Sequence, residues 1–418
     1  MSESRRYDVA VVGGGVIGLA LALQLLDRGR SVLVLERGAV GSGASHGNCG
    51  TITPSHALPL SVPGVIGDVL RWMSARDAPF YVQPRFDLEL WTWLLGFARR
   101  CNWANARRVA KARASLLTRS REWLAQLIAN ERIECEFVES GLLTLFASER
   151  AFERARYLER ELPALGIAIE AWTPAAIAAA EPALQSDLAA GHWYPGDARL
   201  RPDRFVAALA ERVRARGGEI REQAPVARLL AGGDGVVAAV SAQPIAAAQL
   251  VLCAGAWSPE LTRTLGLAIP LQPGKGYSIT FDRPRICPSR PLVLREPSVC
   301  VSSWDSGYRL GSTMEFAGYD PSLNRIRLDA LVRGAERFLV EPEGPRRIEE
   351  WAGWRPMSVD ELPIIGRSER YPNLYYATGH GMLGVSMAVA TGRLLADEIC
   401  GRAPEMDLAA FSPRRFGL

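Results

Sequence analysis

The stretch Val9 to Gly18 reads VAVVGGGVIG, and it decides the fold because an apolar strand runs into a glycine turn and then into a helix. Gly13, Gly15 and Gly18 fall on the G-x-G-x-x-G spacing of dinucleotide-binding turns. Gly13 permits the tight turn, Gly15 lets the backbone approach a pyrophosphate, and Gly18 lets the helix pack close to the strand. The sequence therefore predicts a βαβ unit whose helix N-terminus presents amides to an anion.

The segments around this turn have the order that such a unit needs. We expect a strand over Tyr7 to Val12, a helix over Val16 to Arg28 that is ended by Gly29, and a second strand over Ser31 to Leu35. Glu36 follows the second strand, close to the roughly 20-residue offset at which an acid receives a ribose hydroxyl. An acid at this position disfavours a cofactor that carries a 2′-phosphate.

Composition limits the remaining classes of protein. The 418 residues are 48% apolar and carry a net charge of only +4, which supports a substantial core and gives no nucleic-acid footprint. The seven cysteines are widely spaced without a C-x-x-C pair, so we expect neither a disulfide framework nor a metal site. The first strand begins at Tyr7, which leaves no room for a secretory signal, and we expect a cytoplasmic protein. Glu89 to Phe97 (ELWTWLLGF) is too short to span a bilayer; it fits either a membrane interface or a helix packed on its own domain.

Two further glycine-marked sites lie far from the first. Leu250 to Ser258 reads LVLCAGAWS, and Tyr375 to Leu395 reads YYATGHGMLGVSMAVATGRLL, a strand followed by glycines and a helix. If all three sites share one ligand, the cofactor domain is discontinuous. Other expected elements are a helix over Pro202 to Arg216, a β-meander of Glu219 to Leu230 and Gly235 to Ser241 turning at Gly232 to Gly235 and running into Gln249 to Cys253, and antiparallel strands at Tyr277 to Phe281, Val299 to Ser303 and Tyr308 to Leu310.

With these residues in hand, the chain resembles the flavoprotein family of D-amino acid oxidases, glycine and sarcosine oxidases and bacterial D-amino acid dehydrogenases. The resemblance covers essentially the whole length. The loop Gly47 to Gly50, followed by Pro54, Ser55 and His56, looks most like the dehydrogenase branch. The matching segments, in family order, are VVGGGVIGLALALQL, ASHGNCG, LCAGAWS, GWRPMSVDELPIIG and GHGMLGVSMAVATG.

The resemblance implies an α/β fold with a discontinuous, Rossmann-like FAD-binding domain and an α+β substrate domain with a mainly antiparallel sheet. The FAD domain would comprise residues 1–80, 196–262 and 353–418, and the substrate domain residues 81–195 and 263–352. Non-covalent FAD is expected, with Val226 near the adenine at the end of a strand over Gln223 to Val226. The residues expected to bind it are Gly13, Gly15, Val16, Ile17, Gly18, Glu36, Arg37, Ser42, Ser45, His46, Asn48, Gly50, Val226, Ala254, Gly255, Trp257, Gly381, Met382, Leu383 and Gly384.

The resemblance also implies a substrate site. Arg355 matches the carboxylate-binding position in G-x-R-P, where a guanidinium can clamp a planar carboxylate with two hydrogen bonds. Tyr277 is expected either to add a hydroxyl to the carboxylate or to be packing. His56 is the favoured substrate-side histidine, and His46 and His380 are the others beside the flavin motifs; the ordinary imidazole pKa allows any of them to titrate near neutral pH.

The expected reaction is FAD-dependent oxidative deamination of a small D-amino or cyclic imino acid, D-proline or hydroxy-D-proline included. Hydride passes from Cα to flavin N5, and water hydrolyses the imine. The expected partners are the amino or imino acid and a quinone or other electron acceptor, with peripheral contact at the inner face of the membrane as an option and no nucleic acid. Two alternatives stay open: a glycine or sarcosine type oxidase that uses oxygen, and a flavin electron-transfer subunit without an amino acid site.

Overall fold

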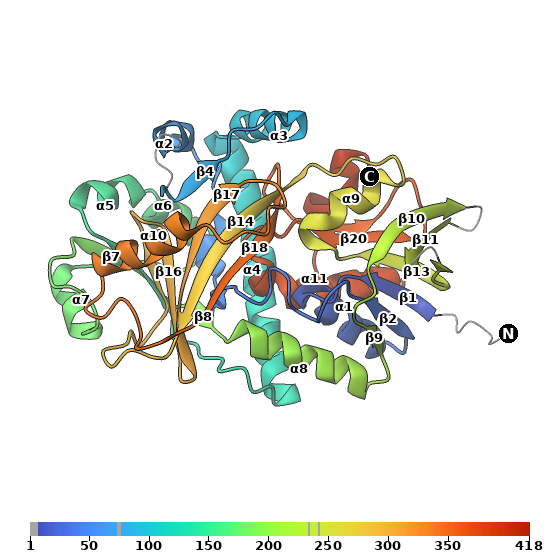
Figure 1. Cartoon of the computed structure of the whole chain (residues 1–418), viewed down its shortest axis with the longest axis horizontal. Helices are drawn as coiled ribbons and strands as arrows, with labels where there is room; N and C mark the ends of the chain where they lie inside the picture. The colour runs from blue at the N-terminus through green and yellow to red at the C-terminus, as the bar shows by residue number, and fades with distance from the viewer. Residues whose placement is uncertain (1–6, 73–76, 233–234, 241–242) are drawn as a thin grey trace.

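The computed structural model describes residues 7–72, 77–232, 235–240 and 243–418. Two large sheets lie side by side (Figure 1), a six-stranded one containing β1, β2 and β13 on the right and a nine-stranded one containing β14, β16, β17 and β18 on the left. Within the described ranges, no helix is long and apolar enough to cross a membrane.

The six-stranded sheet has the order β19-β20-β13-β1-β2-β9, and all its pairings are parallel except that of β19 with β20. The expected strand over Tyr7 to Val12 is confirmed to the residue, and the expected helix begins at Val16. That helix ends two residues earlier than expected because Gly29 has a left-handed backbone, with φ at +76°. The elements are β1 (Tyr7–Val12), α1 (Val16–Leu26), β2 (Val32–Leu35), β9 (Glu219–Arg221), β13 (Ala247–Leu252), β19 (Ile364–Arg367) and β20 (Leu374–Thr378).

Alternating side chains of this sheet enter two different cores. Val9 and Val11 of β1 pack with α1, α4 (Trp103–Glu131), α8 (Pro202–Ala215) and α11 (Gly384–Ile399). Ala10 and Val12 pack on the other face with β10 (Val226–Gly232), β11 (Gly235–Val240) and α9 (Ser258–Arg263). A strand buried on both faces is typical of a doubly covered parallel sheet.

The expected β-meander is wrong in its connectivity. Residues 219–221 form β9 and pair with β2, whereas 226–232 form β10 and pair with β11, so no single strand runs over Glu219 to Leu230. The chain turns between them at Gln223, whose φ is +53°, and the expected strand over Gln223 to Val226 is absent from this described stretch. β13 joins β1 instead of the meander. Part of the expected turn (233–234) and Ser241 lie outside the described residues.

The nine-stranded sheet is mainly antiparallel, as expected, and the three strands predicted for it are confirmed in extended form. One face packs on α10 (Arg325–Glu336) through the core of Ile279, Leu310 and Leu331. Its strands are β4 (Phe80–Val82), β5 (Leu142–Phe146), β6 (Glu170–Trp172), β7 (Ala190–Tyr194), β14 (Leu271–Phe281), β15 (Leu292–Leu294), β16 (Val299–Trp304), β17 (Gly307–Phe316) and β18 (Arg347–Ser358).

The remaining elements are short, apart from one helix that covers the upper edge of the molecule in Figure 1. This helix is α3 (Leu88–Arg99), and the tryptophan-rich segment lies within it. The others are β3 (Thr51–Ile52), β8 (Ala198–Arg199), β12 (Gln243–Pro244), α2 (Val65–Trp72), α5 (Glu149–Ala155), α6 (Leu158–Glu161) and α7 (Pro174–Ala180), with short 3-10 turns that include Pro54–Ala57 and Gly255–Trp257.

The division into two domains stays a prediction. The strands of the six-stranded sheet fall within 1–80, 196–262 and 353–418, and β5 to β7 and β14 to β17 fall within 81–195 and 263–352. β4 and β18 cross the expected boundaries.

Candidate functional site

A cavity of about 620 Å³ extends from the glycine turn after β1 to the nine-stranded sheet. Its walls come from the N-termini of α1 and α11, the loop of residues 41–53, the 253–257 segment and strands β14 and β18. The predicted site residues that line it are Gly13, Gly15, Val16, Ile17, Glu36, Arg37, Ser42, Ser45, Asn48, His56, Val226, Ala254, Gly255, Trp257, Tyr277, Arg355, Gly381, Met382, Leu383 and Gly384.

Three predicted residues do not line the cavity. A Cβ on Gly18 would lie 2.0 Å from the Gly13 carbonyl oxygen, so Gly18 serves the close packing of α1 on the turn. A Cβ on Gly50 would lie 1.9 Å from the Leu200 carbonyl oxygen. The His46 ring points away, and its Nε2 lies 2.7 Å from Glu349 Oε1. For Gly50 and His46 the expected direct contact with the cofactor therefore has no support, because local packing already uses both positions.

The turn after β1 fits a dinucleotide. Gly13 has φ at +114°, and a Cβ there would lie 2.4 Å from the Cys253 carbonyl oxygen. Gly15 is the N-cap of α1 and has no side chain to cap it; the Val16 amide donates to Ser45 Oγ at 3.1 Å, and the positive end of the helix opens into the cavity. Glu36 accepts hydrogen bonds from the amides of Gly14 (2.7 Å) and Gly38 (2.9 Å), and its oxygens keep lone pairs for a ribose hydroxyl.

A second uncapped helix opens into the same cavity. The N-cap of the 16-residue helix α11 is Leu383, again without a side-chain cap, and Gly381 lies before it with φ at +56°. Also in the lining, Arg37 covers the ring of Trp257, with Cζ 3.5 Å from the ring centroid. Two positive helix ends in one cavity suit a ligand with separated anionic or electron-rich groups.

Arg355 is a cation without a carboxylate partner. Its Nη1 donates to the Thr313 carbonyl at 2.6 Å and its Nη2 to the Ser312 carbonyl at 3.5 Å, and no carboxylate lies within ion-pair distance among the described residues. Burial lowers the pKa of the guanidinium to about 10, so the group stays charged at neutral pH. A Cβ on Gly276 would lie 2.3 Å from Arg355 Cζ, so the guanidinium rests on a glycine of β14.

Tyr277 does not present its hydroxyl to Arg355, and the expectation that it adds a hydroxyl to the carboxylate is wrong. Arg355 pairs with Gly274, so the two share a face of the sheet, whereas Tyr277 lies three residues further along β14 and faces the other way. Its ring joins the core beneath α10, and its hydroxyl donates to Glu315 Oε2 at 2.5 Å.

For His56 and His380 the expected titration near neutral pH is wrong, because burial lowers the pKa of both. Burial, with the charges of Arg113 and Arg295, lowers the pKa of His56 to about 4, and burial lowers that of His380 to about 3. His56 is a neutral cavity residue whose Nδ1 lies 3.2 Å from Ser55 Oγ. Ser55 in turn donates to Asp197, a carboxyl whose pKa burial raises to about 7.

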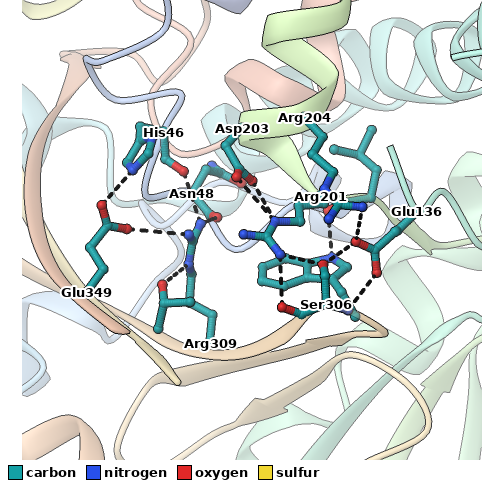
Figure 2. Close-up of polar contacts among 12 residues, drawn as sticks. His46, Asn48, Glu136, Arg201, Asp203, Arg204, Ser306, Arg309 and Glu349 are labelled. Carbon is teal, nitrogen blue, oxygen red and sulfur yellow. Dashed lines mark hydrogen bonds and ion pairs between the residues drawn. The ribbon is translucent and has the colours of Figure 1, made fainter. Parts of the chain in front are cut away.

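A buried arginine fixes the loop of residues 46–50 against the nine-stranded sheet (Figure 2). Arg309 of β17 donates to the carbonyls of His46 (3.0 Å) and Asn48 (2.7 Å), and its guanidinium lies 3.8 Å from Glu349. Figure 2 also shows the neighbouring network of Arg201, Asp203, Arg204, Glu136 and Ser306, which joins the start of α8 to the β16–β17 turn. The loop is held from outside the cavity.

Several residues that line the cavity were not predicted from the sequence. Trp351 lies two residues before Gly353 on β18, and a Cβ on Gly353 or on Gly47 would meet its ring at about 2 Å. Strand alternation from Arg355 gives the only sequence signal for Trp351. Arg113, Cys49 and Cys300 line the cavity from separate segments, and no spacing links them.

Comparisons with known proteins agree with this geometry. Residues 8–398 match the family described as FAD dependent oxidoreductase (DAO). A D-amino acid dehydrogenase of Paramagnetospirillum magneticum is 34% identical over 416 residues, covering 98% of each chain, and one of Methylobacterium radiotolerans is 33% identical, covering 95% of this chain and 97% of that protein. The crystal structure of glycine oxidase from Geobacillus kaustophilus has a TM-score of 0.79 and 24% identity, covers 97% of this chain and 98% of that one, and supports the fold.

Proposed function

The chain belongs to the DAO family of FAD-dependent oxidoreductases, and from this premise we propose that it is a dehydrogenase of a small D-amino or cyclic imino acid. The family makes it an enzyme with FAD as cofactor, an amino acid as substrate and a separate electron acceptor. The D configuration is supported by the full-length relatives named D-amino acid dehydrogenase. The proposed substrate class includes the cyclic imino acids D-proline and hydroxy-D-proline.

We propose that FAD lies along the cavity from the glycine turn to β18. The α1 N-terminus would hold the pyrophosphate, Glu36 the adenosine ribose, and the backbone at Val226 the adenine; Gly381 to Gly384 would face the electron-rich edge of the flavin. When bound, FAD supplies the acceptor for the hydride that leaves the substrate Cα. No cysteine link to the cofactor is part of this proposal.

The proposal of a carboxylate-bearing substrate rests on the guanidinium of Arg355, which has no carboxylate partner among the described residues. Two other buried arginines have carboxylates nearby: Arg113, which lines the cavity, lies 3.9 Å from Glu361, and Arg309, outside the lining, lies 3.8 Å from Glu349. Arg355 donates to two backbone carbonyls and to the Met314 sulfur at 3.8 Å, and its guanidinium lines the cavity with N–H donors to spare. A bidentate pair with a substrate carboxylate would offset the cost of a buried, unpaired charge and would orient Cα.

His56 is the candidate acceptor for the proton of the substrate amine, and it is a weak base. His56 is neutral above about pH 4, so its free nitrogen can accept a hydrogen bond from the amine, but its low pKa gives little driving force for proton transfer. We therefore propose that His56 positions the amine and that the neutral amine is selected by burial beside the Arg355 cation. Trp351 and Trp354 wall off the same end from water.

For the electron acceptor we propose a quinone reached at a membrane surface. Helix α3 buries Leu90 and Trp93 and exposes Leu88 (68%) and Leu95 (60%), with Phe86 (91%) just before it. Together with Trp91 these side chains form an apolar stripe that suits a lipid surface. Sedimentation with anionic vesicles tests the contact: Leu88→Ser/Leu95→Ser should bind less than the parent, and equal sedimentation contradicts it.

A substrate panel under anaerobic conditions tests the function. D-amino acids, with D-proline and hydroxy-D-proline among them, should bleach the flavin much faster than their L-enantiomers. Faster reduction by glycine or sarcosine would move the protein to the amine oxidase alternative. No reduction by any amino or imino acid would favour the electron-transfer subunit, which needs no carboxylate clamp.

The acceptor is tested separately. Turnover with an artificial quinone should exceed turnover with oxygen, and peroxide formation at the quinone-coupled rate would contradict a dehydrogenase. The control is the same assay without amino acid, which measures background flavin oxidation.

A further inference from the structure

Two thiols from distant segments meet on the cavity wall near Arg355. Cys49 lies in the loop of residues 46–50, and Cys300 lies in β16, 251 positions away along the chain. Both line the cavity, and both are half-buried. Neither has a part in the proposed binding of FAD or of the substrate carboxylate.

Two contacts fix Cys49 over β16. Its carbonyl accepts a hydrogen bond from Ser302 Oγ at 2.6 Å, and its Sγ lies 4.0 Å from the Cys300 carbonyl oxygen. Ser302 and Cys300 are two residues apart on one strand, so their side chains lie on the same face. Arg309 holds the loop just before Cys49 through the Asn48 carbonyl. The position of the Cys49 sulfur is therefore determined by the sheet.

Gly311 has no side chain, which leaves room for the Cys49 sulfur beside Cys300. Gly311 lies directly opposite Cys300 in the β16–β17 ladder, and a Cβ on Gly311 would lie 2.6 Å from Cys49 Sγ. Directly opposite residues have Cβ positions about 4.5–5.5 Å apart on the same face. Cys49 Sγ thus occupies the place of the side chain that would neighbour Cys300, within reach of the Cys300 thiol.

The electrostatic surroundings give the two sulfurs different roles. A hydrogen bond from the Cys300 thiol, with the charges of Arg309 and Arg355, holds the pKa of Cys49 below its usual value. The same hydrogen bond and burial raise the pKa of Cys300 well above its usual value. By contrast, burial raises the pKa of Cys135 to about 12 and that of Cys101 to about 11. Cys49 is therefore the more acidic of the two thiols, and Cys300 is the one that holds its proton more tightly.

We propose that Cys49 and Cys300 form a reversible dithiol–disulfide site at the Arg355 end of the cavity, with hydroperoxides as the oxidant. The Cys49 thiolate attacks one peroxide oxygen, the O–O bond breaks, and the leaving hydroxide takes a proton to give water and Cys49 sulfenic acid. The Cys300 sulfur then attacks the Cys49 sulfur, forming the S–S bond and releasing a second water with the Cys300 proton. One peroxide accepts two electrons, and the two cysteines lose them.

The site is tested on the FAD-loaded enzyme with stoichiometric hydrogen peroxide, followed by non-reducing peptide mapping by mass spectrometry. The expected product is a peptide pair linked through Cys49 and Cys300, with an intact mass lower by about 2 Da that dithiothreitol restores. Phenylarsine oxide, which needs two adjacent thiols, should bind once to the parent protein and not to Cys49→Ser or Cys300→Ser. Cys287→Ser, a half-buried cysteine outside the cavity lining, is the matched control and should behave as the parent.

Three outcomes overturn the proposal: oxidation of Cys49 or Cys300 to a sulfinic acid without the link, a link through another cysteine, or arsenical binding that survives in both single variants. The serine variants are isosteric, and FAD content verifies their fold. Benzoate, a planar carboxylate, should slow disulfide formation at least about fivefold by covering the wall beside Arg355. The benzoate experiment rests on the proposed function. If the disulfide forms at the same rate with benzoate present, the two cysteines do not lie at the substrate end of the cavity. Peptide mapping tests the Cys49–Cys300 disulfide without reference to the proposed function.

Discussion

At the scale of single residues, the chemistry of this protein depends on which charges lack a partner. Arg309 and Arg113 are buried cations that have a carboxylate within 4 Å, and both serve to hold loops. Arg355 has none among the described residues and faces the cavity. The residues look alike in sequence, and their partners separate a structural arginine from a candidate ligand-binding one.

Replacement of Arg355 should weaken the transition state without removing the cofactor. Arg355→Leu is expected to lose roughly 3 to 5 kcal/mol in kcat/KM, because a buried substrate carboxylate would lose its full counter-charge. Arg355→Lys should recover only part, since a point charge cannot reproduce the planar fork. Anaerobic flavin reduction measures the loss, with Arg285→Leu at a 92% exposed arginine as the control. A parent-like rate in Arg355→Leu would place the carboxylate elsewhere.

The buried Asp197 should give the protein a pH-dependent stability. Its pKa is about 7 in the folded state against an ordinary 3.8, so the folded protein binds more protons than the unfolded chain between these values. The free energy of unfolding therefore falls as pH rises from about 4 to 7. Asp197→Asn should remove this fall, so its stability relative to the parent should be higher at pH 8 than at pH 5, on the order of 2 kcal/mol.

Urea unfolding at the two pH values measures this difference. Asp305→Asn, the same change at a 95% exposed side chain, is the control and should show no such dependence on pH. Equal relative stability of Asp197→Asn at pH 5 and pH 8 would mean that the carboxyl is ionised in the folded protein throughout.

At the scale of elements, close contacts between helix and strand position the candidate anion site. Helix α1 begins just after β1, and its first turn approaches the Gly13 carbonyl so closely that no side chain fits at Gly18. The same approach directs the N-terminal end of α1 toward the cavity. Packing and ligand binding therefore depend on the same glycines.

Gly18→Ala should accordingly damage both stability and cofactor retention. The added Cβ would lie 2.0 Å from backbone oxygen, which forces α1 away from β1 at a cost of about 3 kcal/mol. Thermal unfolding and the FAD-to-protein absorbance ratio measure the two effects. Gly67→Ala in α2, where nothing lies within 4 Å of the new Cβ, is the matched control. Full FAD content in Gly18→Ala would contradict the link between helix position and binding.

At the scale of the whole molecule, the cavity is a seam between the two large sheets. β1, α1 and α11 supply one wall, and β14 and β18 supply the other. A cofactor in this seam would contact elements of both sheets. Its binding energy therefore adds to the stability of the folded chain.

Removal of FAD should lower the thermal midpoint by several degrees, since saturation at a thousandfold excess over Kd contributes about 4 kcal/mol. Circular dichroism of the stripped and reconstituted protein measures the shift, and added FAD should restore the midpoint. Riboflavin, which lacks the pyrophosphate and adenosine, should restore less. An unchanged thermal midpoint after removal of FAD would mean that the bound cofactor does not stabilise the folded chain.

Much of the fold follows from local sequence, because strand and helix periods are properties of neighbouring residues. The apolar stretch before the glycine turn predicted β1 to the residue, the turn predicted the start of α1, and alternation predicted strands of the nine-stranded sheet. The family resemblance added the cofactor, the order of the three glycine sites and Arg355. By contrast, the meander failed because β9 and β10 are separated by a left-handed residue at Gln223, which the apolar pattern does not reveal.

Contacts between residues that are far apart in the sequence were decided only by the tertiary structure. The register of β14 on β18 sends Tyr277 away from Arg355, and burial takes the pKa of His56 far below neutrality. The contact of Cys49 with Cys300 exists because the loop is anchored over a glycine in the next strand. Sequence by itself determined the βαβ core and the kind of ligand, since these depend on spacing along one segment. Pairing, burial and charge at the site depend on which segments meet, and only the packing of the two sheets sets that.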